Sequence, residues 1–182
     1  MIEYADGDLF DAGIPALAQG VNLDGVMGAG IAAEFRRRYP GMYREYAALC
    51  SAGVLRLGSL HLWTYGEATV FNLATQRHPG PCAQLPAVRS SVRKMLRCAE
   101  VLSIPAVAVP RIGCGLGGLD WAQVNEVLTQ ASATSTVRLV VVTRKVVEAM
   151  KDKECSCRCQ GCVQPPGYTQ YHCGNNAFGC YK

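Results

Sequence analysis

The sequence predicts an α/β protein in which a mostly parallel, mixed sheet is covered by helices on both faces, in three layers. Short apolar segments alternate with amphipathic ones through about the first 150 residues, the pattern of parallel strands joined by helices. Two predicted strands lead into glycine-rich loops, and six of the ten cysteines fall after residue 154. We therefore expect one domain over residues 1–152 and a cysteine-rich tail over residues 153–182.

Six short apolar segments are predicted to be strands, because turn residues bound them. They are Ile2–Tyr4, Ala16–Val21, Ser59–Trp63, Thr69–Asn72, Ala106–Val109 and Arg138–Thr143. The predicted helices are Ala29–Arg38, Met42–Cys50, Leu85–Leu102, one that starts after Asp120, and Lys145–Met150. The clearest of these is Leu85–Leu102, since its apolar residues recur at spacings of three and four.

Composition indicates a folded domain with a sizeable core. Hydrophobic residues make up 49% of the chain and charged residues only 18%, which argues against disorder. The formal charge of +4 fits an anionic ligand without demanding a nucleic-acid surface. No segment reaches the roughly 18 consecutive apolar residues of a membrane span, and MIEYADGDLF lacks the features of a secretory signal. We therefore expect a cytoplasmic monomer with no membrane partner.

Two glycine-rich loops mark the expected ligand site, VNLDGVMGAGIA at 21–32 and PRIGCGLGGLDW at 110–121. Each follows a predicted strand and precedes a predicted helix, which is where α/β folds bind ligands. Glycines let backbone N–H groups approach an anion, and the helix starting near Ala29 adds its positive dipole end. Two such loops suit a diphosphate clamped from both sides. In the alternative interpretation the glycines only make tight turns; no GKS or GKT sequence indicates a P-loop.

Four motifs occur in one order along the chain: GDLF at 7–10, VNLDGVMGAGIAAEF at 21–35, FNLATQ at 71–76 and PRIGCGLGGLDW at 110–121. In this order they resemble the macrodomain family. The most similar branch contains the terminal ADP-ribose protein glycohydrolase and the DNA ADP-ribosyl glycohydrolase antitoxins. NLATQ also resembles macrodomains related to ADP-ribose 1''-phosphate processing. The resemblance spans about residues 1–150 and implies a macrodomain fold that recognises ADP-ribose.

The resemblance implies a role for each matching residue. Asp8 would accept a hydrogen bond from the adenine amino group, with the Leu9 backbone facing the same ring, and Asn22 would lie beside the distal ribose. The other expected ligand residues are Gly28, Ala29, Gly30 and Ile31 on one side, and Ile112, Gly113, Cys114, Gly115, Leu116 and Gly117 on the other. Without the resemblance, Asp8 and Asn22 are ordinary turn residues.

Two positions depart from the branch. Gln76 stands where the glycohydrolases have a lysine, and Gly117 stands where the terminal glycohydrolase has an aspartate. An amide is not a nucleophilic amine, so a mechanism through a lysine adduct is not available at Gln76. The neighbouring Arg77 does not replace the lysine, because its guanidinium stays protonated.

Two residues remain as candidate catalytic groups. Asn22 is expected to orient a water beside the distal ribose, and His78 in the QRHPGP loop is a candidate general acid or base. The alternative for His78 is a solvent-exposed loop residue. Asp120 is explained more simply as a helix cap, and Cys114 as a small packing residue.

Two basic clusters are interpreted as solvated helix surfaces rather than nucleic-acid patches. Arg36–Arg38 end a predicted helix, where cations favour the helix dipole. The other cluster lies along the helix that starts at Leu85 and consists of Arg89, Arg93, Lys94 and Arg97.

The tail is predicted to bind zinc, because thiolates this dense repel one another unless a soft metal binds them. Its candidate ligands are Cys155, Cys157, Cys159, Cys162, His172, Cys173 and Cys180. Only Cys159 and Cys162 have the C-x-x-C spacing of a zinc knuckle. The alternatives are a flexible thiol-rich extension and disulfides, which the cytosol opposes.

We favour a hydrolase that binds ADP-ribose and acts on an ADP-ribose derivative, with no cofactor in the domain. The linkage is either an ADP-ribosyl bond or ADP-ribose 1''-phosphate. The rival hypothesis is a non-catalytic reader of ADP-ribosylated protein or nucleic acid, which Gln76 and Gly117 favour. A third hypothesis places the main function in the tail, as a metal or redox interaction module.

Overall fold

A computed structural model describes residues 1–144 and places six strands in one sheet. The strands are β1 (Ile2–Asp6), β2 (Ala16–Val21), β3 (Leu60–Tyr65), β4 (Ala68–Ala74), β5 (Ala106–Val109) and β6 (Arg138–Thr143). Their order is β1-β6-β5-β2-β4-β3, and every neighbouring pair is parallel except β3 with β4. The predicted helix Lys145–Met150, the boundary at residue 152 and the tail lie outside the described residues.

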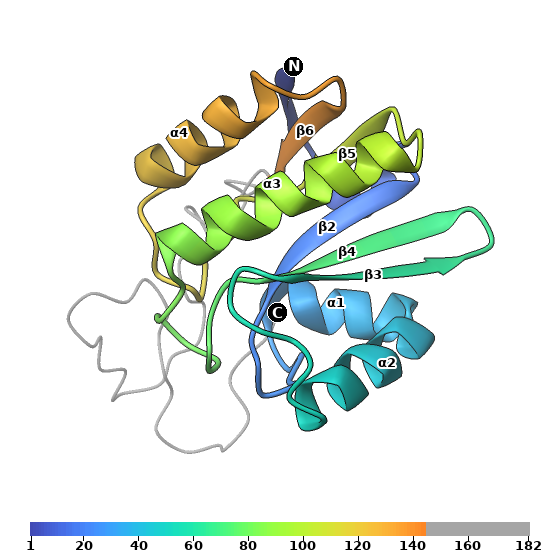
Figure 1. Cartoon of the computed structure of the whole chain (residues 1–182), viewed down its shortest axis with the longest axis vertical. Coiled ribbons are helices and arrows are strands. Elements are labelled where there is room, and N and C mark those ends of the chain that lie inside the picture. The colour runs from blue at the N-terminus through green and yellow to red at the C-terminus, as the bar shows by residue number, and fades with distance from the viewer. Residues whose placement is uncertain (145–182) are drawn as a thin grey trace, which may run out of the picture. The chain divides into compact units, whose positions relative to one another are not determined.

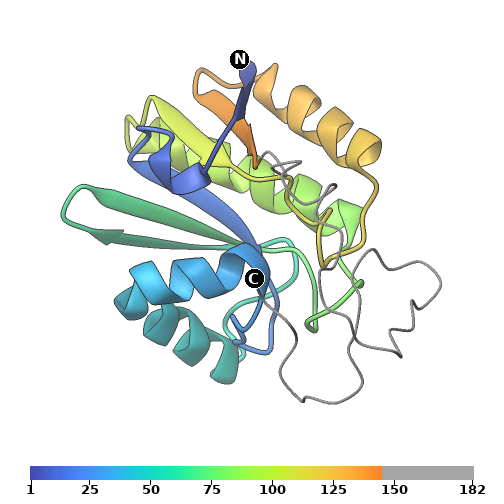
Figure 2. The ribbon, with the colours of Figure 1, turned by 180° about the vertical axis from the view of Figure 1, so that it is seen from behind.

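Helices cover both faces of the sheet, so the predicted three layers are confirmed (Figures 1 and 2). On one face lie α3 (Leu85–Val101) and α4 (Trp121–Ser132), and on the other lie α1 (Gly30–Arg38) and α2 (Pro40–Ser51). Side chains of β2 alternate between the two cores, with Ala16 and Ala18 facing α3 and α4, and Leu17 and Val21 facing α1 and α2.

The structure extends several predicted elements by one to three residues. Helix α2 begins at Pro40 rather than Met42. Proline is favoured at the first position of a helix, because the N–H it lacks would have no partner within the helix at that position. The sequence did not predict the short 3-10 helix η1 at Leu9–Asp11. The Asp8 carboxylate caps η1 by accepting a hydrogen bond from the Phe10 N–H, at 2.9 Å.

The parallel strands end at one edge of the sheet, and three loops follow them there. These are the first glycine loop (residues 22–29, after β2), the His78 loop (residues 75–84, after β4) and the second glycine loop (residues 110–120, after β5). Because parallel strands bring their carboxyl ends together, this edge collects the predicted site residues.

Candidate functional site

Asp8 lies two residues after the end of β1 and keeps one carboxylate oxygen available. One oxygen, Oδ1, caps η1 through the Phe10 N–H, while the second oxygen has no protein partner among the described residues. Leu9 is buried against the core beneath α1, which fixes the backbone of η1. The turn role and the expected adenine contact are therefore compatible, since a carboxylate accepts several hydrogen bonds.

The Asn22 side chain holds the first glycine loop in shape. Its Nδ2 donates to the Val26 carbonyl at 2.7 Å, and its Oδ1 accepts from the N–H groups of Asp24 at 3.0 Å and Val26 at 3.2 Å. The buried Tyr46 hydroxyl donates to the Asn22 carbonyl at 2.8 Å and lies 3.0 Å from Oδ1. Burial raises the pKa of Tyr46 far above its usual value, so this hydroxyl stays a neutral donor. One Nδ2 hydrogen of Asn22 remains for a ligand or water.

At this edge of the sheet the second glycine loop contacts the start of α1, which directly follows the first glycine loop. Gly30 has a φ of +57°, and a Cβ placed on it would lie 3.6 Å from Cδ1 of Leu116 in the opposite loop. Leu116 is 63% exposed and is therefore not packed into the core. Ala29, the N-cap of α1, makes no side-chain cap, which leaves the first N–H groups of the helix open to an anion.

The second glycine loop is anchored by its own residue Ile112, which lies three residues after β5 and is fully buried. The loop closes on itself, since the Leu119 N–H donates to the Gly113 carbonyl at 2.9 Å and the Gly118 N–H donates to the Gly115 carbonyl at 3.1 Å. Gly113 needs its left-handed φ of +76° for this turn. Gly115, by contrast, has open space around its Cβ position.

Gly117 is a position without room for a side chain. A Cβ there would lie 2.6 Å from the Gly113 carbonyl oxygen and 2.9 Å from Cβ of Ala83. The Ala83 N–H also donates to the Gly117 carbonyl at 3.1 Å, which ties the second glycine loop to the His78 loop. An aspartate therefore cannot replace Gly117 without moving both loops.

The Gln76 side chain stabilises the conformation of the His78 loop. Its Nε2 donates to the His78 carbonyl at 2.7 Å and to the Gly80 carbonyl at 3.3 Å. The Leu23 N–H donates to the Arg77 carbonyl at 3.0 Å and so joins this loop to the first glycine loop. The amide at position 76 thus has a structural role where the related branch has a lysine.

His78 pairs with Asp24 across these two loops. Its Nδ1 lies 3.0 Å from Asp24 Oδ2 and 3.2 Å from Oδ1, and the imidazole is 71% exposed. Asp24 is in turn held by its N–H, which donates to Asn22 Oδ1. The structure therefore brings together both predicted catalytic residues, His78 and Asn22, through Asp24. Sequence reasoning missed Asp24; its only signal was the Asx-turn spacing from Asn22.

Two further candidates have structural roles. Asp120 caps α4, accepting a hydrogen bond from the Gln123 N–H at 3.1 Å. Burial raises the pKa of the Cys114 thiol, so the reactive thiolate is disfavoured, as expected for a packing residue. Within residues 1–144 no three His, Cys, Asp or Glu side chains gather as a metal site, and no helix there is long and apolar enough to cross a membrane. The predicted zinc ligands Cys155 to Cys180 lie outside these residues.

The geometry of facing glycine loops at the carboxyl ends of parallel strands agrees with the comparison to known families. A profile of the Macro domain family matches residues 18–128, so the chain belongs to the macro domain family.

Three similar proteins illustrate the range of the family. A DNA ADP-ribosyl glycohydrolase of Mycobacterium tuberculosis is 37% identical over 135 residues, which cover 72% of this chain and 38% of that protein. The chain therefore corresponds to only part of this relative. The solved macrodomain of Mycobacterium tuberculosis DarG has a TM-score of 0.73 and 36% identity, over 78% of this chain and 97% of that one. An ADP-ribose 1''-phosphate phosphatase of Candida albicans is 28% identical over 71% of this chain and 93% of its own length.

Proposed function

We propose that this chain binds ADP-ribose and hydrolyses the bond between the distal ribose and a group attached to it. The observations that support the proposal are the two glycine-rich loops at the carboxyl ends of β2 and β5, and the contact between Leu116 Cδ1 and the Gly30 Cβ position at 3.6 Å. Backbone N–H groups from both loops and the uncapped start of α1 suit a diphosphate. Asp8 at one end and Asn22 at the other match the adenine and distal ribose in such a ligand.

The distal end offers a mechanism that uses neither a lysine nor an aspartate at positions 76 and 117. Asp24 accepts the Nδ1 proton of His78, which leaves Nε2 as the basic nitrogen. Water attacks the anomeric carbon, the bond to the leaving group breaks, and the proton from water passes through Nε2 to the leaving group. We assign the second Nδ2 hydrogen of Asn22, which has no acceptor among the described residues, to the water or the ribose hydroxyl. These steps need no resident cofactor.

A non-catalytic reader is the second candidate function. The observations that favour it are the structural roles of Gln76 and Gly117, which stand where related hydrolases carry reactive side chains. Both candidates share the proposed ADP-ribose site and differ only in turnover.

Calorimetry with ADP-ribose, followed by turnover assays on 1''-phosphate, acetylated, protein-linked and DNA-linked ADP-ribose, tests the proposal. We expect an affinity of micromolar order, roughly −8 kcal/mol. Asp8→Asn keeps an oxygen for capping η1 but loses the charge, and should weaken binding by about 1.5–3 kcal/mol. The exposed Asp11→Asn in the same helix is the matched control. Binding without any turnover would establish the reader, and absence of binding would refute both.

We further propose that the tail binds one zinc through a subset of Cys155, Cys157, Cys159, Cys162, His172, Cys173 and Cys180. Their number and chemistry support this, since four soft ligands make a tetrahedral site. Elemental analysis of protein purified without added metal or chelator is the direct test.

A further inference from the structure

The strand β3 lies at one edge of the sheet and lacks the features that block an edge. It pairs with β4 on one side only, and Figures 1 and 2 show the β3–β4 hairpin extending past the helices. Its sequence, LHLWTY, contains no Lys, Arg, Asp, Glu or Pro, and its register with β4 is continuous. Soluble proteins usually protect an exposed edge with charges, prolines or bulges, because unpaired backbone groups can bind another strand. An edge without them can accept a further strand.

The hydrogen-bond pattern shows which residues of β3 face outward. In an antiparallel pair, opposed residues alternate between pairs that exchange backbone hydrogen bonds and pairs that do not. The Ala74 N–H donates to the Ser59 carbonyl at 3.0 Å, so every second residue from Ser59 to Tyr65 bonds to the β4 side. The residues between them turn their N–H and C=O groups to the outer edge, where these groups have no partner within residues 1–144. They are Leu60, Leu62 and Thr64.

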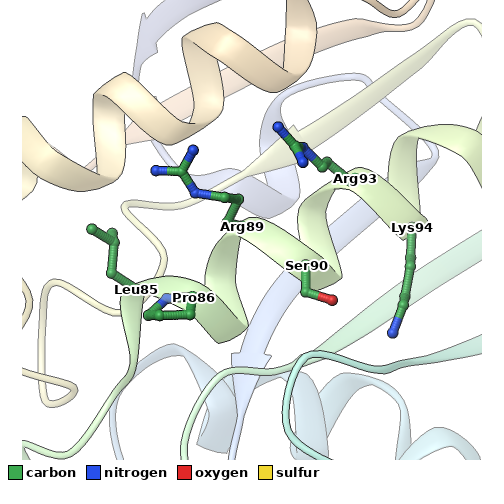
Figure 3. A pocket seen from close by; sticks show the side chains of 6 residues that line it. All are labelled: Leu85, Pro86, Arg89, Ser90, Arg93 and Lys94. Atoms are coloured by element: carbon green, nitrogen blue, oxygen red, sulfur yellow. The ribbon is translucent and has the colours of Figure 1, made fainter.

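The start of β3 is held in place by α3. Ser90 Oγ and Lys94 Nζ both donate to the Gly58 carbonyl, at 2.9 and 2.8 Å. In Figure 3 these two side chains point away from Arg89 and Arg93. Gly58 has a left-handed φ of +73°, and a Cβ there would lie 2.9 Å from the Cβ of Ser90. The edge is therefore fixed before a partner binds, which lowers the entropic cost of pairing.

Two unpaired charges of opposite sign flank this edge. Glu67, in the turn between β3 and β4, is exposed, and its carboxylate has no partner within residues 1–144. The exposed Arg56 guanidinium is unpaired in the same part of the chain. Arg56 lies at the start of β3, because the Ser59 N–H donates to its carbonyl at 2.9 Å. A strand of six residues spans about 20 Å, so the two charges cannot meet within one chain.

We propose that this chain forms a two-fold symmetric dimer in which the outer edges of two β3 strands pair antiparallel. Centred on Leu62, the pairing sets Leu60 opposite Thr64 of the partner subunit, so that every outward backbone group is bonded. Glu67 then lies beside Arg56 of the partner subunit, and symmetry repeats this ion pair at the other end. The inference is independent of the proposed function, because none of these residues is assigned to the ligand site.

Self-pairing also covers exposed aromatic surface. Tyr65 is 77% exposed and stacks on Trp63, with ring centroids 6.0 Å apart. In the proposed register it lies opposite Ser59 of the partner subunit. A second copy is preferred over an unrelated strand, because the two charges of the edge complement each other by symmetry. The proposal departs from our sequence-based expectation of a monomer. One pair of strands makes a small interface, so we expect a dissociation constant of about 10–100 µM.

Sedimentation velocity of the full chain tests the dimer, in reductant that prevents the cysteines from cross-linking chains. Glu67→Arg should weaken dimerisation about tenfold, because it turns two attractions into two repulsions. Asp11→Arg is the matched control, since it makes the same change of net charge at an exposed acid of η1, and should stay within about twofold. Arg56→Glu should weaken dimerisation as Glu67→Arg does. The double variant should return to within about threefold of the wild type.

Amide hydrogen exchange identifies the strand that pairs. The amides of Leu60, Leu62 and Thr64 should exchange about fivefold more slowly at a protein concentration about ten times the dissociation constant, since about a fifth of the chains are then monomeric. The amides of His61 and Trp63 already bond to β4 and should change less.

Concentration-dependent protection of the three outward amides, together with restored pairing in the double variant, supports the dimer. A chain that stays monomeric at millimolar concentration, or equal dimerisation by Glu67→Arg and Asp11→Arg, overturns it. Protection that does not depend on concentration would mean that another segment of the same chain covers the edge, and also overturns it. ADP-ribose calorimetry reports on the proposed function alone, so the two can fail separately.

Discussion

The two ends of the proposed ADP-ribose site differ in composition, since the diphosphate end consists mainly of glycine backbone and the distal-ribose end consists of hydrogen-bonded side chains. At the proposed diphosphate end the available donors are glycine backbone N–H groups, and Leu116 of the second glycine loop lies in contact distance of Gly30 at the start of α1. At the distal end they come from interlocked side chains, in which Asn22 holds Asp24, Asp24 holds His78 and Gln76 holds the loop. Backbone donors tolerate sequence change, whereas a side-chain network changes its chemistry with each substitution. This difference is consistent with one fold carrying both hydrolases and readers.

The largest expected effect lies at the distal end, in the proposed acid–base pair. His78→Ala should lower kcat by about 10²–10⁴ while ADP-ribose affinity changes little, since proton transfer acts in the transition state. Gln84→Ala is the matched control, because Gln84 is exposed in the same loop and makes no side-chain cap for α3. Asp24→Asn should give a smaller loss, by releasing the imidazole. Full activity in His78→Ala would remove this residue from the mechanism.

The diphosphate end should respond to charge rather than to size. Gly115→Glu should weaken ADP-ribose binding by about 100-fold, or about 2.7 kcal/mol, because its carboxylate competes with the diphosphate. Gly115→Ala should bind within a few-fold of the wild type, since the Cβ position is open. Calorimetry on the pair separates repulsion from steric hindrance. Equal binding by both variants would show that this loop does not contact the diphosphate.

Much of the fold was predictable because each strand and helix carries its own local pattern. The apolar segments Ala16–Val21 and Ala106–Val109 are strands with the predicted bounds, and the 3.6-residue pattern after Leu85 is α3. The positions of the two glycine-rich loops were predictable for the same reason, because these loops come directly after those strands in the sequence.

The contacts between loops were not predictable from local patterns. Asp24 and His78 are 54 residues apart, so only the order of β2 and β4 in the sheet brings them together. The same holds for Arg56 and Arg77, which line one cavity although separate loops carry them. Gly117 was recognised as a departure, but its lack of space depends on Ala83 from another loop.

The lack of space around Gly117 leads to a prediction about the free energy of unfolding of the domain. Gly117→Asp should destabilise the domain by about 1–3 kcal/mol, because its Cβ would overlap the Gly113 carbonyl. Gly115→Asp adds the same charge where the Cβ position is open, and should cost less than about 0.5 kcal/mol. Urea unfolding of both variants measures the difference. If Gly117→Asp were as stable as the wild type and gained activity, the loops would be more adaptable than this packing indicates.

The smallest expected effect concerns the proposed zinc in the tail. Every residue assigned to the proposed ADP-ribose site lies between Asp8 and Gly117, and residues 1–145 form a compact unit. If tail and domain are separate stability units, a chelator should remove about one equivalent of zinc while ADP-ribose affinity changes by less than about twofold. Elemental analysis before and after chelation, paired with calorimetry, measures both quantities.

A chain truncated after residue 152 is the control, and should bind ADP-ribose equally with or without chelator. A larger loss of affinity in the full chain alone would mean that the tail contributes to the ligand site. Less than about half an equivalent of zinc in the untreated protein would reject a tight metal site in the tail.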